Sequence, residues 1–335
     1  MIDLRQTFAD KEVLITGGLG FIGSSLAIKL VELGANVSII DALIPEYGGN
    51  FFNITDIKDK IKRITIASII DEHAVDFCVK NKDFIFHCAG QVSHVHSQKD
   101  NGKRDVEFNI LGTLNLIDAC KKNNKPAKII YTGTRGEYGR PQTLPVSETH
   151  NTSPQDKHES TKLVAGQFIL QETFKENSVI KGIHCRLTNI YGSRAQMKSK
   201  DYCVFNWFVR QALDNQEIPI FGDGSLLRDW LYIDDCVEAL LLLAACDTAY
   251  GQVFNIGNNK AWSFLDTVKA ITQIANNGTW QFAQFSKERA SQNPGSFITD
   301  ITKIQQNVGW QPTTNINEGI KKTVDYYQQF KQHYW

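Results

Sequence analysis

The chain has 335 residues, 42% of which are apolar, so it can bury the core of one large α/β domain or of two domains, and general disorder is excluded. Basic residues (Lys and Arg) and acidic residues (Asp and Glu) number 36 each, so the formal net charge is zero. This balance argues against a broad surface for polyanions, and we expect neither nucleic acid nor a membrane as a partner.

The seven cysteines are scattered without a Cys-x-x-Cys pair, which is typical of free thiols in a reducing compartment and not of disulfides or a zinc site. No stretch approaches the roughly 18 uncharged apolar residues that a membrane span requires. The first residues also lack the basic and then apolar pattern of a secretory signal. We therefore expect a cytoplasmic protein.

The first predicted elements are an apolar strand at 12–16, a glycine-rich turn, a helix at 22–33 and a second strand at 36–41. A strand, a helix and a strand within about 30 residues are the signature of a right-handed parallel unit. Further strands are expected at 63–67, 83–87, 128–131, 182–186 and 252–256, and helices near 70–80, 104–123 and 159–176. This alternation predicts an α/β fold with a doubly wound parallel sheet.

After about residue 190, loops alternate with amphipathic helical patterns at 204–215, 264–276 and 317–330. We predict a first α/β domain at 1–190 and a smaller α+β domain at 191–335. The late strand at 252–256 implies that a segment near 230–257 returns to the first domain, so that the two domains interleave in sequence.

The turn after the first strand contains Gly18-x-Gly20-x-x-Gly23 at the start of a helix. Glycines there permit a tight turn and a close approach of backbone N–H groups to a pyrophosphate, and the helix N-terminus adds partial positive charge. Asp41 ends the next strand, where a carboxylate accepts hydrogen bonds from the adenosine ribose and repels a 2′-phosphate. The motif predicts a dinucleotide, with NAD favoured over NADP; a plain helix start followed by a solvated Asp is the alternative. The expected contacts are Gly17, Gly18, Gly20, Phe21, Ile22, Gly23 and Asp41.

Six ordered segments carry a family likeness across nearly the whole chain. They are 16–23 with its glycines, His-Cys-Ala-Gly at 87–90, Asn-Ile-Leu-Gly-Thr at 109–113, Arg-Leu-Thr-Asn-Ile-Tyr-Gly at 186–192, Phe-Gly-Asp-Gly-x-x-x-Arg-Asp-Trp at 221–230 and Val-Gly-Trp-x-Pro at 308–312. The chain resembles the extended short-chain dehydrogenases/reductases, particularly the nucleotide-sugar epimerases and dehydratases. The resemblance implies a Rossmann domain that holds NAD, with Ala89 and Gly90 beside it, and a small C-terminal domain that holds a nucleoside-diphosphate sugar. It also implies a homodimer paired through the helices near 104–123 and 159–176.

Family catalysis uses a Ser or Thr and a helical Tyr-x-x-x-Lys, and the matching positions here are Thr134, His158 and Lys162. The tyrosine has therefore become a histidine. Positions i and i+4 share a helix face, so both side chains would point at the nicotinamide, with Lys162 on its ribose. A neutral imidazole can accept the proton of a sugar hydroxyl, but it reaches roughly 2 Å less far than a phenol, so a bridging water or a shifted substrate is expected. The alternative is that His158 only starts a helix in a protein that binds without catalysis.

The two residues after Thr134 differ from those that the resemblance implies for a dehydratase or a decarboxylase. Dehydratases of this family place Asp-Glu directly after the hydroxyl residue, and the decarboxylases want Glu at the second position, whereas this chain has Arg135 and Gly136. Glu137 is one place late and would face the other way if strand alternation persists. Arg135 would hold a carboxylate or hydroxyl of the sugar or form a surface ion pair.

Asn189 and Arg228 match positions that hold the diphosphate in relatives, and a guanidinium offers bidentate donors to phosphate. The alternative for Arg228 is an ion pair with Asp234 or Asp235. Arg289 is a second candidate phosphate ligand.

No metal is expected. His87 ends a strand, whereas His94 and His96 are placed on a loop with no acidic or cysteine ligand beside them, so we interpret all three as satisfied polar residues.

The predicted function is NAD-dependent epimerisation of a nucleoside-diphosphate sugar, most simply at C4 through a transient 4-keto sugar. A dehydratase, a decarboxylase or a net oxidoreductase is the alternative among enzymes. A catalytically silent protein that binds NAD or a nucleotide sugar is the alternative of another class.

Overall fold

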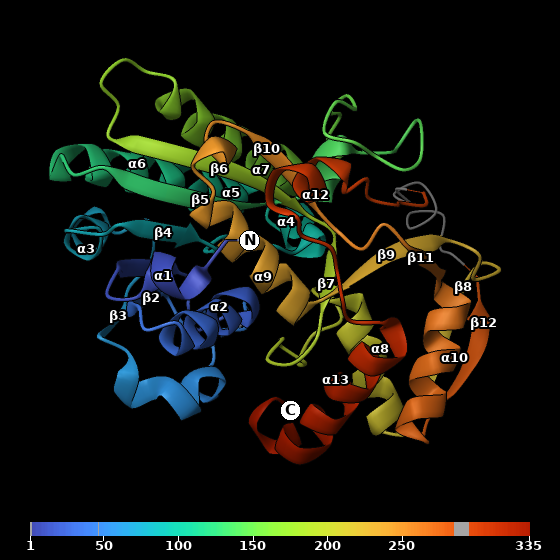
Figure 1. The fold of residues 1–335 in the computed structure, drawn as a ribbon. Coiled ribbons are helices and arrows are strands. Elements are labelled where there is room, and N and C mark those ends of the chain that lie inside the picture. Colours follow the sequence, from blue (N-terminus) through green and yellow to red (C-terminus); the bar gives the residue numbers. More distant parts are fainter. Residues whose placement is uncertain (1, 46, 285–294) are drawn as a thin grey trace.

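A computed structural model of the chain describes residues 2–45, 47–284 and 295–335 (Figure 1). Its central sheet has seven strands in the order β10-β6-β5-β4-β1-β2-β3, and every neighbouring pair is parallel. The strands are β1 (Glu12–Thr16), β2 (Asn36–Asp41), β3 (Arg63–Ile66), β4 (Phe84–His87), β5 (Ala127–Thr134), β6 (Ile180–Leu187) and β10 (Val253–Ile256). The predicted doubly wound sheet is confirmed, with all seven of its expected strands.

Helices cover both faces of this sheet, which explains why its inner strands β1 and β4 and the adjacent β2 are buried along nearly their whole length. The edge strand β3 instead alternates polar and apolar residues and is partly exposed. Within β1, Val13 and Ile15 belong to the core on one face, whereas Leu14 belongs to the core on the other. The first face carries α1 (Leu4–Phe8), α2 (Phe21–Glu32), α9 (Ile233–Ala245) and α12 (Thr302–Val308), and the second carries α3 (Glu72–Cys78), α6 (Gly112–Asn123) and α7 (Lys157–Thr173). None of the described helices is long and apolar enough to cross a membrane.

The second region lies beside the carboxyl ends of the main sheet, at the lower right of Figure 1. A three-stranded sheet joins β7 (Asn189–Tyr191), β9 (Leu227–Tyr232) and β11 (Ala261–Ser263), and a two-stranded sheet joins β8 (Glu217–Phe221) and β12 (Thr279–Ala283). The three expected amphipathic helices are present and pack on one another as α8 (Val204–Leu213), α10 (Phe264–Ala275) and α13 (Ile316–Phe330).

The two regions interleave, as predicted from the late strand. After β9, helix α9 returns to the main sheet, and β10 then pairs with β6 at its edge. Helix α12 also packs on α9 and β10. The division at residue 190 stays a prediction, because the chain passes between the regions more than once.

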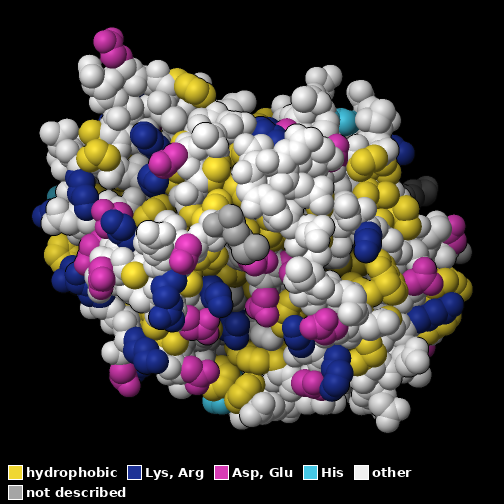
Figure 2. Space-filling model, in the orientation of Figure 1, with side chains coloured by type: hydrophobic (Ala, Val, Ile, Leu, Met, Phe, Trp, Pro, Cys, Tyr) yellow, Lys and Arg dark blue, Asp and Glu magenta, His cyan; other side chains and the backbone are white. Residues whose placement is uncertain are grey.

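Short helical segments complete the described chain. They are η1 (Phe51–Lys60), α4 (His94–Lys99), α5 (Lys103–Asp105), η2 (Val106–Leu111), η3 (Arg135–Tyr138), η4 (Asp247–Ala249) and η5 (Lys331–His333). On the face drawn in Figure 2, basic and acidic side chains are interspersed, in keeping with the zero net charge.

The strand order places the switch point of the sheet between β1 and β4. From β1 the chain builds outward through β2 and β3 on one side, and through β4, β5 and β6 on the other. In open α/β sheets, ligands bind outside the carboxyl ends of the strands at this point, because the loops diverge there and leave a crevice.

Candidate active site

A cavity of about 520 Å³ opens at the carboxyl ends of the central strands and extends to the second region. It collects nearly all of the side chains and glycines that the sequence singled out. The predicted residues that line it are Gly17, Gly20, Phe21, Ile22, Gly23, Asp41, Ala89, Gly90, Thr134, Arg135, His158, Lys162, Asn189 and Arg228.

Two predicted residues are not among those lining the cavity. A Cβ at Gly18 would lie 2.6 Å from Cγ2 of Ile39, so this glycine lets the turn pack on β2 instead of facing the cavity. Arg289 lies outside the described residues.

The glycine-rich turn forms a bare backbone cradle at the N-terminus of α2. Gly17 has a φ of +68°, and a Cβ there would lie 2.9 Å from the backbone nitrogen of Ala89. A Cβ at Gly23 would overlap the carbonyl oxygen of Gly17. Only glycine therefore allows the β1–α2 turn to sit so close to the β4 loop while the N–H groups of the helix start stay open to an anion.

Asp41 lines the cavity at the end of β2 with its carboxylate held by the backbone. Its Oδ2 accepts the N–H of Leu19 at 3.0 Å, and its Oδ1 accepts the N–H of Leu43 at 2.8 Å. Burial raises the pKa of Asp41, although these two hydrogen bonds lower it in part. An anchored acceptor beside a glycine cradle is the donor and acceptor set that an adenosine ribose and a pyrophosphate require, so these residues fit NAD.

Lys162 lies one turn after His158 on α7, as the spacing predicts. Its ammonium lies 4.7 Å from the ring centroid of Tyr131, and burial lowers its pKa to about 8. Thr134 ends β5 and caps η3, where its hydroxyl accepts the N–H of Gly136 at 3.2 Å. The three predicted catalytic residues thus border one cavity.

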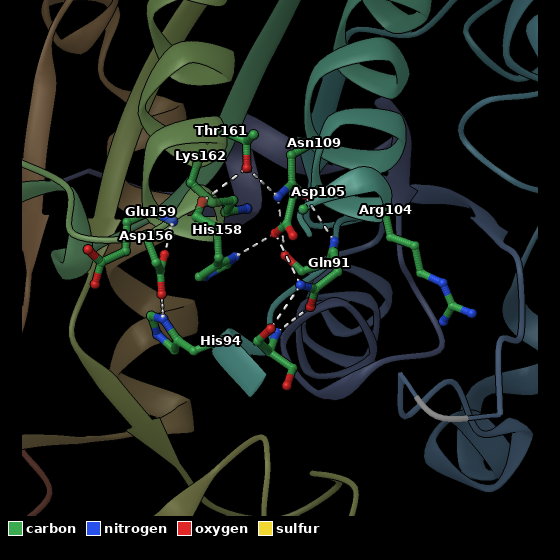
Figure 3. Close-up of polar contacts among 12 residues, drawn as sticks. Gln91, His94, Arg104, Asp105, Asn109, Asp156, His158, Glu159, Thr161 and Lys162 are labelled. Carbon is green, nitrogen blue, oxygen red and sulfur yellow. Dashed lines mark hydrogen bonds and ion pairs between the residues drawn. The ribbon is translucent and has the colours of Figure 1, made fainter. Parts of the chain in front are cut away.

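The imidazole of His158 is almost fully enclosed, with 5% of its side chain exposed. Its Nδ1 lies 3.5 Å from Oδ1 of Asp105, and its ring meets the ring of His94 edge-on at 4.8 Å (Figure 3). Burial lowers the pKa of His158, Asp105 opposes this, and His94 and Lys162 add to it. This direction agrees with the neutral imidazole that a proton acceptor requires, and burial is its chief cause.

The expectation for His94 is wrong in two respects. His94 begins the short helix α4 and is not on a loop, and acidic residues do join it. Its Nδ1 lies 2.5 Å from Oδ2 of Asp156, and one ligand atom each of His94, Asp156 and Glu159 lies within 4.8 Å of the others. Although burial opposes it, the hydrogen bond and charge of Asp156 raise the pKa of His94. The stated reason for expecting no metal at His94 is therefore wrong, and the structure gives the Nδ1 of His94 a hydrogen-bond partner in Asp156.

The other two histidines are satisfied polar residues, as expected. His87 lies between two hydroxyls, with Nδ1 2.8 Å from Oγ1 of Thr16 and Nε2 3.0 Å from Oγ1 of Thr113. His96 lies 3.3 Å from the hydroxyl of Tyr202 through its Nδ1.

Arg228 is buried where β9 of the second region borders the cavity. Its Nη1 donates to the carbonyl oxygens of Leu227 at 2.9 Å and Gly295 at 2.7 Å. Burial, followed by the charge of Arg135, lowers the pKa of Arg228 to about 9. Two guanidinium groups therefore share one desolvated end of the cavity, where an anionic ligand would relieve their repulsion.

The alternative ion pair between Arg228 and the acidic start of α9 is not formed. Asp235 instead accepts the N–H groups of Thr313 and Thr314, at 3.0 and 3.1 Å. No carboxylate of the described residues lies within ion-pair distance of Arg228.

Arg135 is half-buried and does not form the surface ion pair that the sequence allowed. Its Nε donates to Oδ1 of Asn189 at 2.9 Å, and its guanidinium carbon lies 5.0 Å from the ring centroid of Phe297. Burial lowers the pKa of Arg135. Asn189 therefore holds this guanidinium at the cavity wall.

Glu137 points away from the cavity, but strand alternation is not the reason. The chain leaves β5 into the turn η3, and the fully buried carboxylate lies 2.7 Å from Nε of Arg186 and 3.0 Å from Nε2 of His184. Among the described residues that line the cavity, Asp41 is the only one with a carboxylate.

Sequence reasoning missed Asp105 and the pair His94–Asp156. Asp105 comes from α5, and Asp156 caps α7. No motif or spacing in the sequence joins either carboxylate to a histidine so far away along the chain.

Comparison with known proteins agrees with this geometry. Residues 13–257 match the model of the NAD dependent epimerase/dehydratase family. The chain is 30% identical over 321 residues to a UDP-glucose 4-epimerase of Mycolicibacterium smegmatis, covering 95% of this chain and 99% of that protein. It is 28% identical to a UDP-N-acetyl-alpha-D-glucosaminuronate decarboxylase of Bacillus cytotoxicus, covering 96% and 99%.

The fold also matches solved structures. The crystal structure of a UDP-glucose 4-epimerase of Thermotoga maritima with UDP-glucose superposes with a TM-score of 0.85 at 29% identity, covering 96% of this chain and 99% of that one. The glycine cradle, the anchored Asp41 and the match over 13–257 lead to one conclusion. This chain belongs to the NAD-dependent epimerase/dehydratase family of extended short-chain dehydrogenases/reductases, and its cofactor is NAD.

Proposed function

We propose that this protein is an epimerase that inverts C4 of a nucleoside-diphosphate sugar. One observation carries the proposal: the pair His158 and Lys162 lines the same cavity as the glycine cradle and as the arginines Arg135 and Arg228. Bound NAD supplies reversible hydride acceptance, and the arginines supply charge for a diphosphate.

The proton transfers belong to the chain's own residues. Nε2 of His158 accepts the proton of the C4 hydroxyl, directly or through one water, and returns it when the alcohol forms again. The hydroxyl of Thr134 holds the C4 oxygen, and Lys162 holds the nicotinamide ribose and sets the local positive charge. Asn189 orients Arg135 toward the diphosphate by the hydrogen bond to its Nε.

The carboxylate arrangement favours epimerisation over dehydration or decarboxylation. The dehydratase Asp and Glu positions hold Arg135 and Gly136, and a Cβ at Gly136 would lie 2.6 Å from Oε1 of Glu159. Glu159 therefore occupies the space that a side chain at position 136 would need, and it does not line the cavity. Glu137 is paired with Arg186 and is not available to a substrate. A C4 epimerase needs no such carboxylate, because it breaks no bond at C5 or C6.

The silent binding protein is less well supported. A protein that only binds has no use for a hydroxyl, an imidazole and a buried ammonium that line the same cavity. Keeping Lys162 desolvated costs free energy, and such perturbed groups cluster at functional sites.

The subunit arrangement and compartment are part of the proposal. We infer a homodimer paired through the helical run 104–123 and the helix α7, because Val106 and Leu111 are apolar and nearly half exposed on that run. The seven cysteines are free thiols, which supports a reducing compartment such as the cytoplasm.

The decisive experiment incubates the NAD-loaded protein with a panel of nucleotide sugars in deuterated water and follows the products by NMR. A C4 epimer without deuterium and without accumulated NADH supports the proposal. Deuterium on carbon would indicate a keto–enol step, and net NADH formation would indicate an oxidoreductase. No conversion of any sugar, with binding retained, would establish the silent alternative.

A further inference from the structure

A buried carboxylate faces the proposed base from a different helix. Asp105, at the end of α5, is fully enclosed, and its Oδ1 lies 3.5 Å from Nδ1 of His158 (Figure 3). The same Oδ1 accepts a hydrogen bond from Nε2 of Gln91 at 3.1 Å. The backbone N–H of Gln91 in turn donates to Oδ1 of Asn109 at 2.9 Å, so the carboxylate has an anchored neighbour.

The two facing groups both have unused hydrogen-bonding capacity. Oδ2 of Asp105 and Nδ1 of His158 are buried and have no hydrogen-bond partner among the described residues. Buried polar atoms are nearly always paired, and an unpaired one costs about 1–3 kcal/mol. A small closure of the 3.5 Å gap between Nδ1 of His158 and Oδ1 of Asp105 would give Nδ1 its missing partner, since a neutral imidazole can donate from Nδ1 and a carboxylate oxygen can accept a second hydrogen bond.

We propose that Asp105 is a positioning residue that accepts the Nδ1–H of His158 and so leaves Nε2 unprotonated toward the cavity. This inference rests on the proposed function, in which His158 is the base. An imidazole without such a partner divides between two tautomers, and only one of them carries its lone pair on Nε2. When the C4 hydroxyl gives its proton to Nε2, the Nδ1 proton stays on the ring and Asp105 stabilises the imidazolium. The same proton returns to the C4 oxygen, so the step balances.

The charged groups around His158 set the expected pH dependence. His94 faces it from α4 and Lys162 from its own helix α7, and both cations lower its pKa. Asp105 and Asp156 raise its pKa, and Asp105 is the larger of the two. Although burial raises the pKa of Asp105, its hydrogen bonds and the charge of His158 lower it further, so the carboxylate is ionised. Removal of its charge therefore lowers the pKa of His158.

Asp105→Asn tests this role with little change in shape. We expect kcat to fall by about 10- to 100-fold, with KM for the nucleotide sugar nearly unchanged, by analogy with the carboxylate partners of metal-bound histidines, whose loss has effects of this size. The acidic limb of the rate profile should also move to lower pH. A structural defect alone would lower the rate without moving this limb. Unchanged kcat and an unchanged limb would overturn the proposal.

Asp59→Asn is the matched control. Asp59 is an exposed carboxylate on η1, outside the helices of the proposed dimer, and it does not line the cavity. Its loss should leave both kcat and the pH profile unchanged. An equal shift of the acidic limb in Asp59→Asn would show that Asp105 acts only through net charge and would overturn the positioning role.

A second measurement needs no turnover. In protein labelled with ¹⁵N-histidine and loaded with NAD, His158 should show a protonated Nδ1 and a bare Nε2, with its signals assigned by their loss in His158→Phe. The Asp105→Asn protein should show more of the other tautomer. A protonated Nε2 in the unmodified protein would overturn the proposal. If the tautomer is as expected and no sugar is epimerised, only the proposed function fails.

Discussion

At the residue scale, the proposed base is an imidazole at the position where the family resemblance implies a phenol. His158→Phe keeps an aromatic ring and removes the proton acceptor, so we expect kcat to fall by about 10²–10⁴-fold with NAD still bound. The wild-type rate should decline as pH falls through the pKa of His158, which burial holds below its usual value, because the imidazolium cannot accept a proton. Stopped-flow or steady-state rates across pH measure both effects.

A second substitution, His158→Tyr, tests whether the cavity can still accommodate a phenol at this position. Restored or increased activity would mean that the cavity still accommodates the longer phenol of its relatives. Loss of activity would mean that the pocket, with His94 edge-on against the ring, has been rebuilt around the shorter base. Wild-type turnover by His158→Phe would contradict the catalytic assignment altogether.

A second prediction at the residue scale concerns Arg228, whose proposed contribution to binding comes from one buried guanidinium charge. Arg228→Ala should weaken binding of the nucleotide sugar by about 30-fold, or about 2 kcal/mol, through loss of a charge-assisted contact to the diphosphate. Isothermal titration with the nucleotide sugar and with NAD measures the difference. NAD affinity should stay unchanged, and an unaltered Kd for the nucleotide sugar would show that Arg228 serves only its two carbonyl partners.

At the element scale, an ion pair ties the turn after β5 to the neighbouring strand β6. Glu137 is fully buried between Arg186 and His184, and it also accepts the N–H of Thr134 at 2.9 Å. Glu137→Gln leaves a buried guanidinium uncompensated and should destabilise the protein by about 3–5 kcal/mol. Urea unfolding measures this loss.

The pH dependence of that stability follows from the sign of the shift. Although burial opposes it, His184 and Arg186 lower the pKa of Glu137 below its ordinary value. Its stabilising contribution is therefore complete above about pH 4.5 and disappears as pH falls through the lower folded pKa. The difference between wild type and Glu137→Gln should shrink over that acidic range, and a difference that stays constant there would contradict the ion pair.

At the scale of the whole molecule, the proposed dimer would bury apolar side chains that the single chain leaves open. Val106 is 46% exposed and Leu111 is 47% exposed on one helical run. We expect the wild-type protein to sediment at twice 37.8 kDa and the double variant Val106→Arg, Leu111→Arg to sediment as a monomer. Phe282→Arg, on β12 of the second region, is the control for an exposed apolar side chain elsewhere and should leave the mass unchanged. A monomeric wild type would contradict the dimer.

By itself, the sequence predicted the sheet, the cofactor and most of the candidate residues that line the cavity. The alternation of strands and helices can be predicted because the apolar pattern of each element lies within its own segment of the sequence. The seven strands are predicted from such short apolar runs. The glycines of the β1–α2 turn predict a dinucleotide, because the backbone there leaves no room for side chains. Asp41 at the end of β2 is what favours NAD over NADP. Lys162 could be placed beside His158 because four residues make about one helical turn.

Only the tertiary structure decided which groups meet across separate elements. Asp105 faces His158, Asp156 holds His94, and Glu159 fills the space beside Gly136, although no spacing in the sequence brings these pairs together. The distance between two helices depends on how their side chains pack against the common sheet. The protonation of a histidine depends in turn on burial and on charges that this packing brings near, so the state of His158 follows from the fold and not from its neighbours along the chain.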